Sequence, residues 1–283
     1  MLRVTTLYAS SASASAAYYT QYLTQAVGEA PGEWCGVQAD QLGLNGEVTA
    51  DALQALLEGR DPNTGTPLGR ALVDRYRTDG TRVRAVAGFD ATFSAPKSVS
   101  VLWALTGDDR VLDVHDQAVA AALAHLERFG ATTRVRVNGS RMFPDTNGLT
   151  MATFRQSTSR ADDPQLHTHA VISTKVQTVD GRWWALDARY LKRHQRMLGG
   201  LYQSALRAGM AERFGVAWGP IVSGQAEIAG VPDELLRLLS KRTVQVDAAL
   251  VDKVAEFRSR EGRDPSRWER AALTREEIGR AHV

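Results

Sequence analysis

Apolar residues at helical spacing mark four segments of the chain. A repeat of apolar positions every three to four residues is typical of amphipathic helices. Ser13 or Ser15 is placed to cap the first helix and Thr49 the second, and Gly215 closes the last. The predicted helices span residues 16–27, 50–60, 115–129 and 188–215.

Alternating and β-branched runs predict strands between these helices. A short turn, ADDPQ, joins two of the runs, so these two strands should pair antiparallel. The predicted strands are residues 2–8, 83–93, 98–105, 134–139, 151–160, 166–179 and 180–186.

Beyond Gly215 the pattern changes to short, charged helical segments. Strands mixed with helices, followed by helices alone, predict an α+β fold. We expect an α+β body over residues 1–215 and a helical subdomain over residues 216–283. The last segment has no helix stop signal, so we expect the chain to be part of a longer protein.

Composition indicates a soluble globular protein. The 283 residues include 34 Lys and Arg against 32 Asp and Glu, a net charge of +2, and 43% are hydrophobic. A single cysteine, Cys35, excludes an internal disulfide. No apolar run is long enough to span a membrane, and the N-terminal region lacks the apolar core of a signal peptide, so a cytoplasmic location is expected.

The strongest chemical signal is a His-Thr-His run inside a predicted strand. Alternate strand residues point to one face, so His167 and His169 project side by side and can offer two neutral nitrogens to a metal. Two partly exposed surface histidines are the ordinary alternative. On the preceding strand Gln156 can lie near His167, where its amide oxygen is either a third ligand or an ordinary hydrogen-bonding group.

A tyrosine pair lies on the first predicted helix. Tyr18 and Tyr22 share a helical face, and Tyr19 is displaced from it. Alone, such tyrosines are typical of partial core packing. Beside a metal-bound phosphate, however, a phenol can be a nucleophile that forms a covalent phosphodiester.

An acidic residue interrupts an apolar strand. Asp90 is expected to be buried, and buried carboxylates usually have a partner. The turn after this strand contains Ser94, Lys97 and Ser98 but lacks the glycines of a phosphate-binding P-loop.

Three motifs in order, the tyrosine pair, FDATFSAPKSVS and TSRADDPQLHTHAV, resemble the relaxase domain of conjugative plasmids. The resemblance is to the TraI/TrwC (MobF) branch of the HUH endonuclease superfamily, and it is best over residues 1–215. It implies a central antiparallel sheet flanked by helices. It also implies metal-dependent, strand-specific nicking and rejoining of DNA at an origin of transfer, through a covalent 5′-phosphotyrosine.

The resemblance implies roles for individual residues. Tyr18 would be the nucleophile, with Tyr19 and Tyr22 as further catalytic candidates. Asp90 would orient a histidine or accept the tyrosine proton. His167 and His169 would be metal ligands. Lys97 and Arg160, which lie in the matching segments, would contact DNA.

The family also implies partners. These are single-stranded DNA at the origin of transfer with an adjacent hairpin, together with accessory relaxosome and coupling proteins, and no membrane insertion.

Two positions depart from the family pattern. The family's third histidine, eleven residues before the first of the HTH run, is Gln156 here. An amide oxygen is a hard ligand, so Mg²⁺ or Mn²⁺ is expected in preference to Zn²⁺. A second tyrosine pair is replaced by Gln25 and Ala26. Either Tyr22 substitutes for it or one tyrosine performs both cleavages.

Basic and aromatic residues suggest DNA contacts. Arg189, Lys192 and Arg193 lie on one predicted helix, although such charge runs are usually only solvated surface. Strand alternation places one of Trp183 and Trp184 in the core, and an exposed Trp184 would offer a base-stacking surface.

Two alternatives to a conjugative relaxase are kept open. One is an origin-binding module with weak or no nicking, favoured by the missing third histidine. The other is a replication-type HUH initiator, which the FDATFSAPKSVS segment disfavours.

Overall fold

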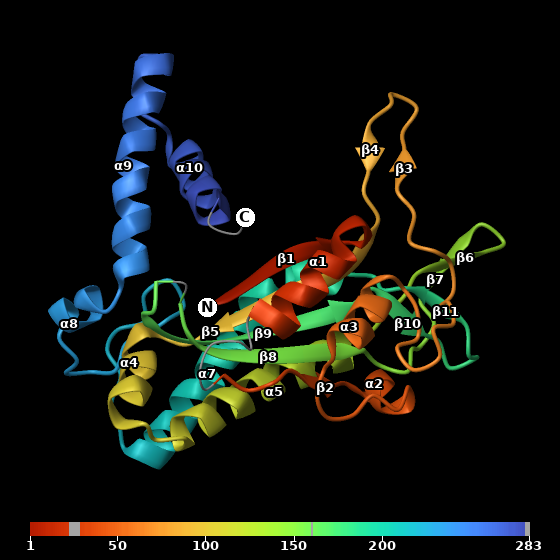
Figure 1. Ribbon diagram of the computed structural model, residues 1–283, viewed down its shortest axis with the longest axis horizontal. Helices are drawn as coiled ribbons and strands as arrows, with labels where there is room; N and C mark the ends of the chain where they lie inside the picture. The colour runs from red at the N-terminus through yellow and green to blue at the C-terminus, as the bar shows by residue number, and fades with distance from the viewer. Residues whose placement is uncertain (23–28, 160, 281–283) are drawn as a thin grey trace. The chain divides into compact units, whose positions relative to one another are not determined.

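The computed structural model describes residues 1–22, 29–159 and 161–280 (Figure 1). The chain divides into two compact units. The first unit consists of Met1–Ser157 with Leu166–Ala229, and the second of Thr158–Gln165 with Gly230–Val283.

A five-stranded sheet with the order β1-β5-β9-β8-β2 forms the centre of the first unit (Figure 1). Its antiparallel pairing sets Thr92 opposite His169 and Ser94 opposite His167. The central strand β9 is buried along most of its length because helices cover both of its faces. The expected α+β class with a central antiparallel sheet is therefore confirmed. The strands are β1 (Leu2–Tyr8), β2 (Glu33–Cys35), β5 (Val86–Ser94), β8 (Met151–Thr158) and β9 (Pro164–Ser173).

Three small hairpins lie outside this sheet. The strand predicted over residues 83–93 is interrupted, because its first residue belongs to a hairpin that extends away from the sheet (Figure 1). The hairpins pair β3 (Arg75–Tyr76) with β4 (Arg82–Val83), β6 (Val135–Val137) with β7 (Ser140–Met142), and β10 (Lys175–Gln177) with β11 (Trp183–Ala185).

Short helices pack on one face of the sheet. Ala16 and Tyr19 join Leu53, Phe154 and Val171 in one apolar cluster. Thr49 Oγ1 accepts a hydrogen bond from Ala52 N (3.3 Å), so the predicted cap is confirmed. The expected Ser13 or Ser15 cap is wrong, because the helix begins after Ser11. These elements are η1 (Ala9–Ser11), α1 (Ala12–Ala17), the π-helical turn η2 (Tyr18–Tyr22), α2 (Val37–Gln41) and α3 (Ala50–Leu57).

Longer helices cover the opposite face, where Tyr202 packs on Phe93 with ring centroids 5.4 Å apart. The helix predicted over residues 188–215 is interrupted at His194 and ends, as expected, at a left-handed Gly215. The helices of this layer are α5 (Arg110–Gly130), α6 (Arg189–Arg193) and α7 (Gln195–Phe214).

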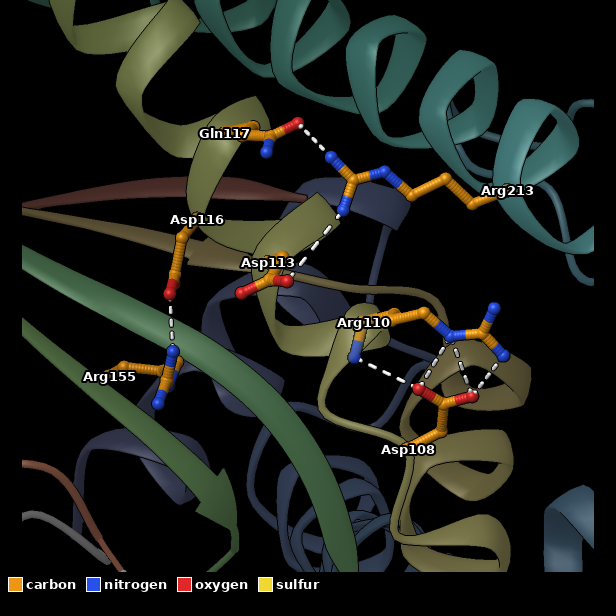
Figure 2. A network of polar contacts seen from close by, with 7 residues as sticks. All are labelled: Asp108, Arg110, Asp113, Asp116, Gln117, Arg155 and Arg213. Atoms are coloured by element: carbon orange, nitrogen blue, oxygen red, sulfur yellow. Dashed lines mark hydrogen bonds and ion pairs between the residues drawn. The ribbon is translucent and has the colours of Figure 1, made fainter.

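Polar contacts join this helical layer to itself and to the sheet (Figure 2). Arg213 on α7 donates to Gln117 (3.0 Å) and pairs with Asp113 (3.7 Å), both on α5. Asp116 on α5 pairs with Arg155 of β8, the residue before Gln156. This ion pair therefore joins β8 to α5 on the sheet face opposite the side chain of Gln156.

The strand predicted over residues 98–105 is wrong, because the segment forms helix α4 (Lys97–Thr106). Glu227, distant in sequence, accepts hydrogen bonds from the backbone N–H groups of Lys97 (3.3 Å) and Ser98 (2.7 Å). A carboxylate at this end satisfies unpaired donors and complements the helix dipole. Gly107 ends the helix in the left-handed conformation.

The second unit contains the C-terminal helices. Helix α9 packs against α8 and α10. The sequence predicted short segments here, whereas α9 is 21 residues long. None of the described helices is long and apolar enough to cross a membrane. The helices are α8 (Asp233–Leu238), α9 (Lys241–Glu261) and α10 (Arg267–Arg280).

Candidate active site

A carboxylate and an imidazole meet between strands β5 and β9. Nδ1 of His169 lies 3.0 and 2.9 Å from the two oxygens of Asp90. Thr92 Oγ1 lies 3.3 Å from both Asp90 Oδ1 and His169 Nδ1. The pairing of Thr92 with His169 in the sheet explains this contact, because Asp90 projects from the same face one alternation away.

The two histidines of β9 share that face. The ring centroids of His167 and His169 are 5.2 Å apart, and both residues are buried. Because the Asp90 carboxylate occupies Nδ1 of His169, the nitrogen left for a metal is Nε2. This carboxylate–imidazole arrangement is the usual second-shell support of a metal-binding histidine.

Asp90 is held ionised although it is buried. Burial alone would raise the pKa of its carboxyl, but the charge of His169 and hydrogen bonds from His169, Tyr19 and Thr92 outweigh it and hold the pKa below its usual value. Burial, together with the Asp90 charge, raises the pKa of Tyr19 well above its usual value. Tyr19 is therefore a neutral phenol that donates to Asp90.

The two neighbouring tyrosines have different surroundings. Tyr19 is only 3% exposed. Its ring stacks on Phe154 (5.3 Å between centroids) and meets His169 at an angle of 62°. Tyr18 is half-buried, and its ring lies edge-on to Tyr19 at 5.2 Å. Both lie in the π-helical turn η2, a geometry frequent at functional sites. Tyr22 ends that turn, and its side chain lies outside the described residues.

Gln156 lies at the same sheet face. It follows Phe154 by two residues on β8, so its side chain emerges on the side that Tyr19 covers. Among the described residues, no group of three His, Cys, Asp or Glu side chains could hold a metal. His167 and His169 place two imidazoles on this face, and the side chain of Gln156 emerges on the same side. Arg160, Gln25 and Ala26 lie outside the described residues.

The predicted DNA contacts that the structure describes are spread over the first unit. Lys97 begins α4, which meets β9 where Leu166 N donates to Ser100 Oγ (2.9 Å). Trp184 is exposed, as expected for one of the pair, whereas Trp183 is half-buried and not in the core.

The predicted basic helix α6 lies on the far side of the sheet from Asp90. Arg189 is paired with Asp187 (2.5 Å). The Lys192 ammonium lies over the ring of Phe89, 5.1 Å from its centroid. Phe89 and Asp90 are neighbours on β5 and point to opposite faces. The structure therefore does not bring α6 next to the tyrosines.

One basic element was missed by the sequence analysis. The exposed β3–β4 hairpin has an Asp79-Gly80 turn and an exposed Tyr76, and its strands are flanked by arginines. The Asp-Gly pair between alternating residues is a known hairpin signal. It was readable in RYRTDGTRVR, whose arginines are Arg75, Arg77, Arg82 and Arg84.

A buried polar chain supports the histidines from behind. Thr168, between them, points to the opposite face, where its Oγ1 lies 2.8 Å from Nε2 of His115. Nδ1 of His115 lies 2.8 Å from the hydroxyl of Tyr202. Burial lowers the pKa of His115 to about 3, assisted by the charges of His167 and Arg155. The imidazole is therefore neutral in the folded protein at neutral pH.

We expect His115 to make folding sensitive to acid. Between about pH 6.5 and 3 the unfolded chain binds a proton here that the folded chain does not. The free energy of unfolding therefore falls as the pH falls through this window, by about 1.4 kcal/mol per pH unit. Urea unfolding at pH 7 and pH 4 should show a smaller loss for His115→Gln than for wild type. The exposed His194→Gln serves as control, and equal losses in all three proteins would contradict the expectation.

Comparison with known proteins agrees with this architecture. The family model described as TrwC relaxase matches residues 3–278. The multifunctional conjugation protein TraI of Escherichia coli is 37% identical over 257 residues, which are 85% of this chain and 14% of that protein. TraI of Escherichia coli strain K12 is 42% identical over 182 residues, 63% of this chain and 10% of that protein. The chain thus spans about one seventh or less of these curated relatives.

Solved structures of relaxase TrwC have the same fold. One is a complex with a 27-mer DNA comprising the recognition hairpin and the cleavage site, at 31% identity and a TM-score of 0.78. The match covers 98% of this chain and 90% of the TrwC chain. A metal-bound and a copper-bound complex with origin-of-transfer DNA have the same identity and coverage, with TM-scores of 0.78 and 0.79.

The fold and the family match define a protein of the relaxase class. The chain belongs to the TrwC relaxase family, the MobF branch of conjugative relaxases.

Proposed function

We propose that this protein nicks one strand of an origin of transfer through Tyr18 and then rejoins it. The observation that carries the proposal is the Asp90–His169 pair beneath the tyrosine turn, with His167 alongside. The TrwC structures in complex with cleavage-site DNA support the choice of substrate.

His167, His169 and Gln156 are the proposed ligands of a divalent metal ion. The donor set fits, because Asp90 fixes His169 with Nε2 available and Gln156 emerges from the same face. A bound divalent ion supplies positive charge that polarises the scissile phosphate and neutralises developing charge. The amide oxygen favours Mg²⁺ or Mn²⁺.

Tyr18 and Tyr19 have different proposed roles. The Tyr18 oxygen attacks the scissile phosphorus. A bond forms between the Tyr18 oxygen and this phosphorus, and the bond from the phosphorus to the 3′ oxygen breaks. One proton leaves Tyr18 and one is taken up by the departing 3′ oxygen. Tyr19 is a positioning residue, since its hydroxyl is already donated to Asp90. Asp90 acts by orienting His169, because both of its oxygens lie within 3.0 Å of that ring. The role of Tyr22 stays a prediction.

Basic and aromatic residues are proposed to hold the DNA. The β3–β4 hairpin is a two-stranded ribbon with exposed arginines, a shape that fits the major groove of a DNA hairpin. Its Arg84 packs on Tyr8, 3.8 Å from the ring centroid, which anchors the hairpin base. Lys97, Arg160 and Trp184 are proposed to contact the strand leading to the nick.

The larger assembly is also a proposal. We assign nicking to residues 1–215 and completion of the relaxase domain to residues 216–283, in a cytoplasmic protein. Accessory relaxosome and coupling proteins are the expected partners.

An origin-binding module without nicking is the second candidate, favoured by an amide at Gln156 where the family has a histidine. A labelled single-stranded origin oligonucleotide with its hairpin separates the two. In Mn²⁺ we expect a denaturation-resistant protein–DNA adduct that EDTA reduces at least about tenfold, because metal charge stabilises the transition state.

Binding without an adduct would favour the second candidate. The Gln156→His variant then shows where the defect lies. Recovered adduct would assign it to the metal site, and continued absence of adduct on the cognate origin would reject the nicking proposal.

A further inference from the structure

Four aromatic rings form a continuous row across helices α6 and α5. The rings of His194 and Tyr190 have centroids 4.4 Å apart. The Tyr190 hydroxyl lies 3.2 Å from Nε2 of His125, and the ring of His125 lies 4.6 Å from that of Phe129. We call these four residues the back row.

The back row is open to solvent at both ends. Phe129 is 47% exposed and His194 is exposed as well. Gly130 allows the row to close up, because a Cβ there would lie 2.9 Å from the Tyr190 ring. A packed row of rings in water is a surface that can stack against other flat groups.

One cation lies over a ring of the back row, and three more lie close to the row in sequence. The Arg128 guanidinium lies over Phe129, 5.2 Å from the ring centroid. Lys192, Arg193 and Arg196 follow Tyr190 closely in sequence, and all four cationic residues are exposed. In the part of the chain that the structure describes, none of the four forms an ion pair.

Two nearby acidic side chains already have other partners. Glu127 accepts hydrogen bonds from the backbone N–H groups of Val37 (2.9 Å) and Leu149 (2.7 Å). Asp187 holds Arg189. The positive charge around the back row is therefore left without a partner carboxylate, and such a field attracts a polyanion.

This surface is separate from the tyrosine site. Lys192 covers Phe89, which points away from the face of Asp90, His167 and His169. The sheet therefore lies between the back row and the proposed metal ligands.

We propose that the back row and its four cations bind a second segment of single-stranded DNA, independently of sequence. Rings that stack on bases, beside cations that contact phosphates, are the combination by which proteins hold single strands. This contact goes beyond nicking, because it holds a strand on the face where no cleavage occurs.

The test uses fluorescence anisotropy with a labelled oligo-dT that has no nicking sequence. A back-row variant combines Phe129→Ala with Arg128→Gln, Arg193→Gln and Arg196→Gln. A matched control combines Arg110→Gln with Arg213→Gln, which are ion-paired arginines of the same helical layer. Circular dichroism and urea unfolding check that both are folded.

We expect Kd for the back-row variant to rise about tenfold, because each stacked base contributes about 1–3 kcal/mol. The slope of log Kd against log salt should fall by about 2, near 0.7 for each of three lost phosphate contacts. An oligonucleotide carrying 5-iododeoxyuridine should crosslink to the peptide with Phe129 or Tyr190. The control should change none of these values.

Two results would overturn the proposal. One is an unchanged Kd and salt slope in the back-row variant with no crosslink at this surface. The other is a back-row variant that binds oligo-dT as wild type does but no longer binds a labelled polyglutamate peptide. That result would assign the surface to an acidic protein instead.

Discussion

The Tyr18→Phe variant is expected to lose the covalent protein–DNA adduct and to reduce nicking at least about 10³-fold, because the attacking oxygen is gone. DNA affinity should change less than about threefold, since the ring remains to pack beside Tyr19. The measurement is adduct yield on a labelled origin oligonucleotide, together with anisotropy for binding.

Tyr19→Phe is the matched control, one residue away. It keeps the stacking on Phe154 but loses the hydrogen bond to Asp90. We expect an adduct on the same peptide at about tenfold lower rate, the scale of one charge-assisted hydrogen bond. The opposite pattern, with adduct in Tyr18→Phe and none in Tyr19→Phe, would move the nucleophile to Tyr19.

The β9 site was the most predictable part of the protein, because strand alternation is a local rule. The shared face of His167 and His169 follows from spacing alone. The burial of Asp90 followed from the apolar strand around it, and its contact with His169 is the partner that a buried carboxylate requires.

Elements that depend on distant residues were predicted less well. Residues 98–105 have strand-like β-branched side chains, yet they belong to helix α4, whose N-terminus is capped by Glu227, about 130 residues later. The π-helical turn at Tyr18 and Tyr19 has no sequence signal as simple as a cap or a glycine. In this turn Tyr19 is buried and Tyr18 is only half-buried, and regular helical spacing does not predict which of the two is buried.

The position of α6 shows a related limit. Its basic residues were readable, but which sheet face the helix covers depends on packing against α5 and β5. The structure places Lys192 behind the sheet, so a charge run that seemed to serve the nicking site belongs to a different surface.

Asp90→Asn is expected to be the second most damaging single change. Asparagine can present its amide N–H to Nδ1 of His169, which favours the tautomer with the hydrogen on Nε2, the nitrogen needed for a metal. Losing such a partner typically weakens metal binding 10–100-fold. We expect nicking to fall about 10²–10³-fold, because the orienting carboxylate charge is lost as well.

The design separates this effect from general damage. Mn²⁺ titration by calorimetry reports metal affinity without requiring turnover, and excess Mn²⁺ should restore part of the adduct yield. Thr92→Val, which removes only the hydroxyl beside the pair, should cost no more than about tenfold. If Asp90→Asn bound Mn²⁺ as tightly as wild type while losing nicking, Asp90 would act on the Tyr18 proton rather than by orienting His169.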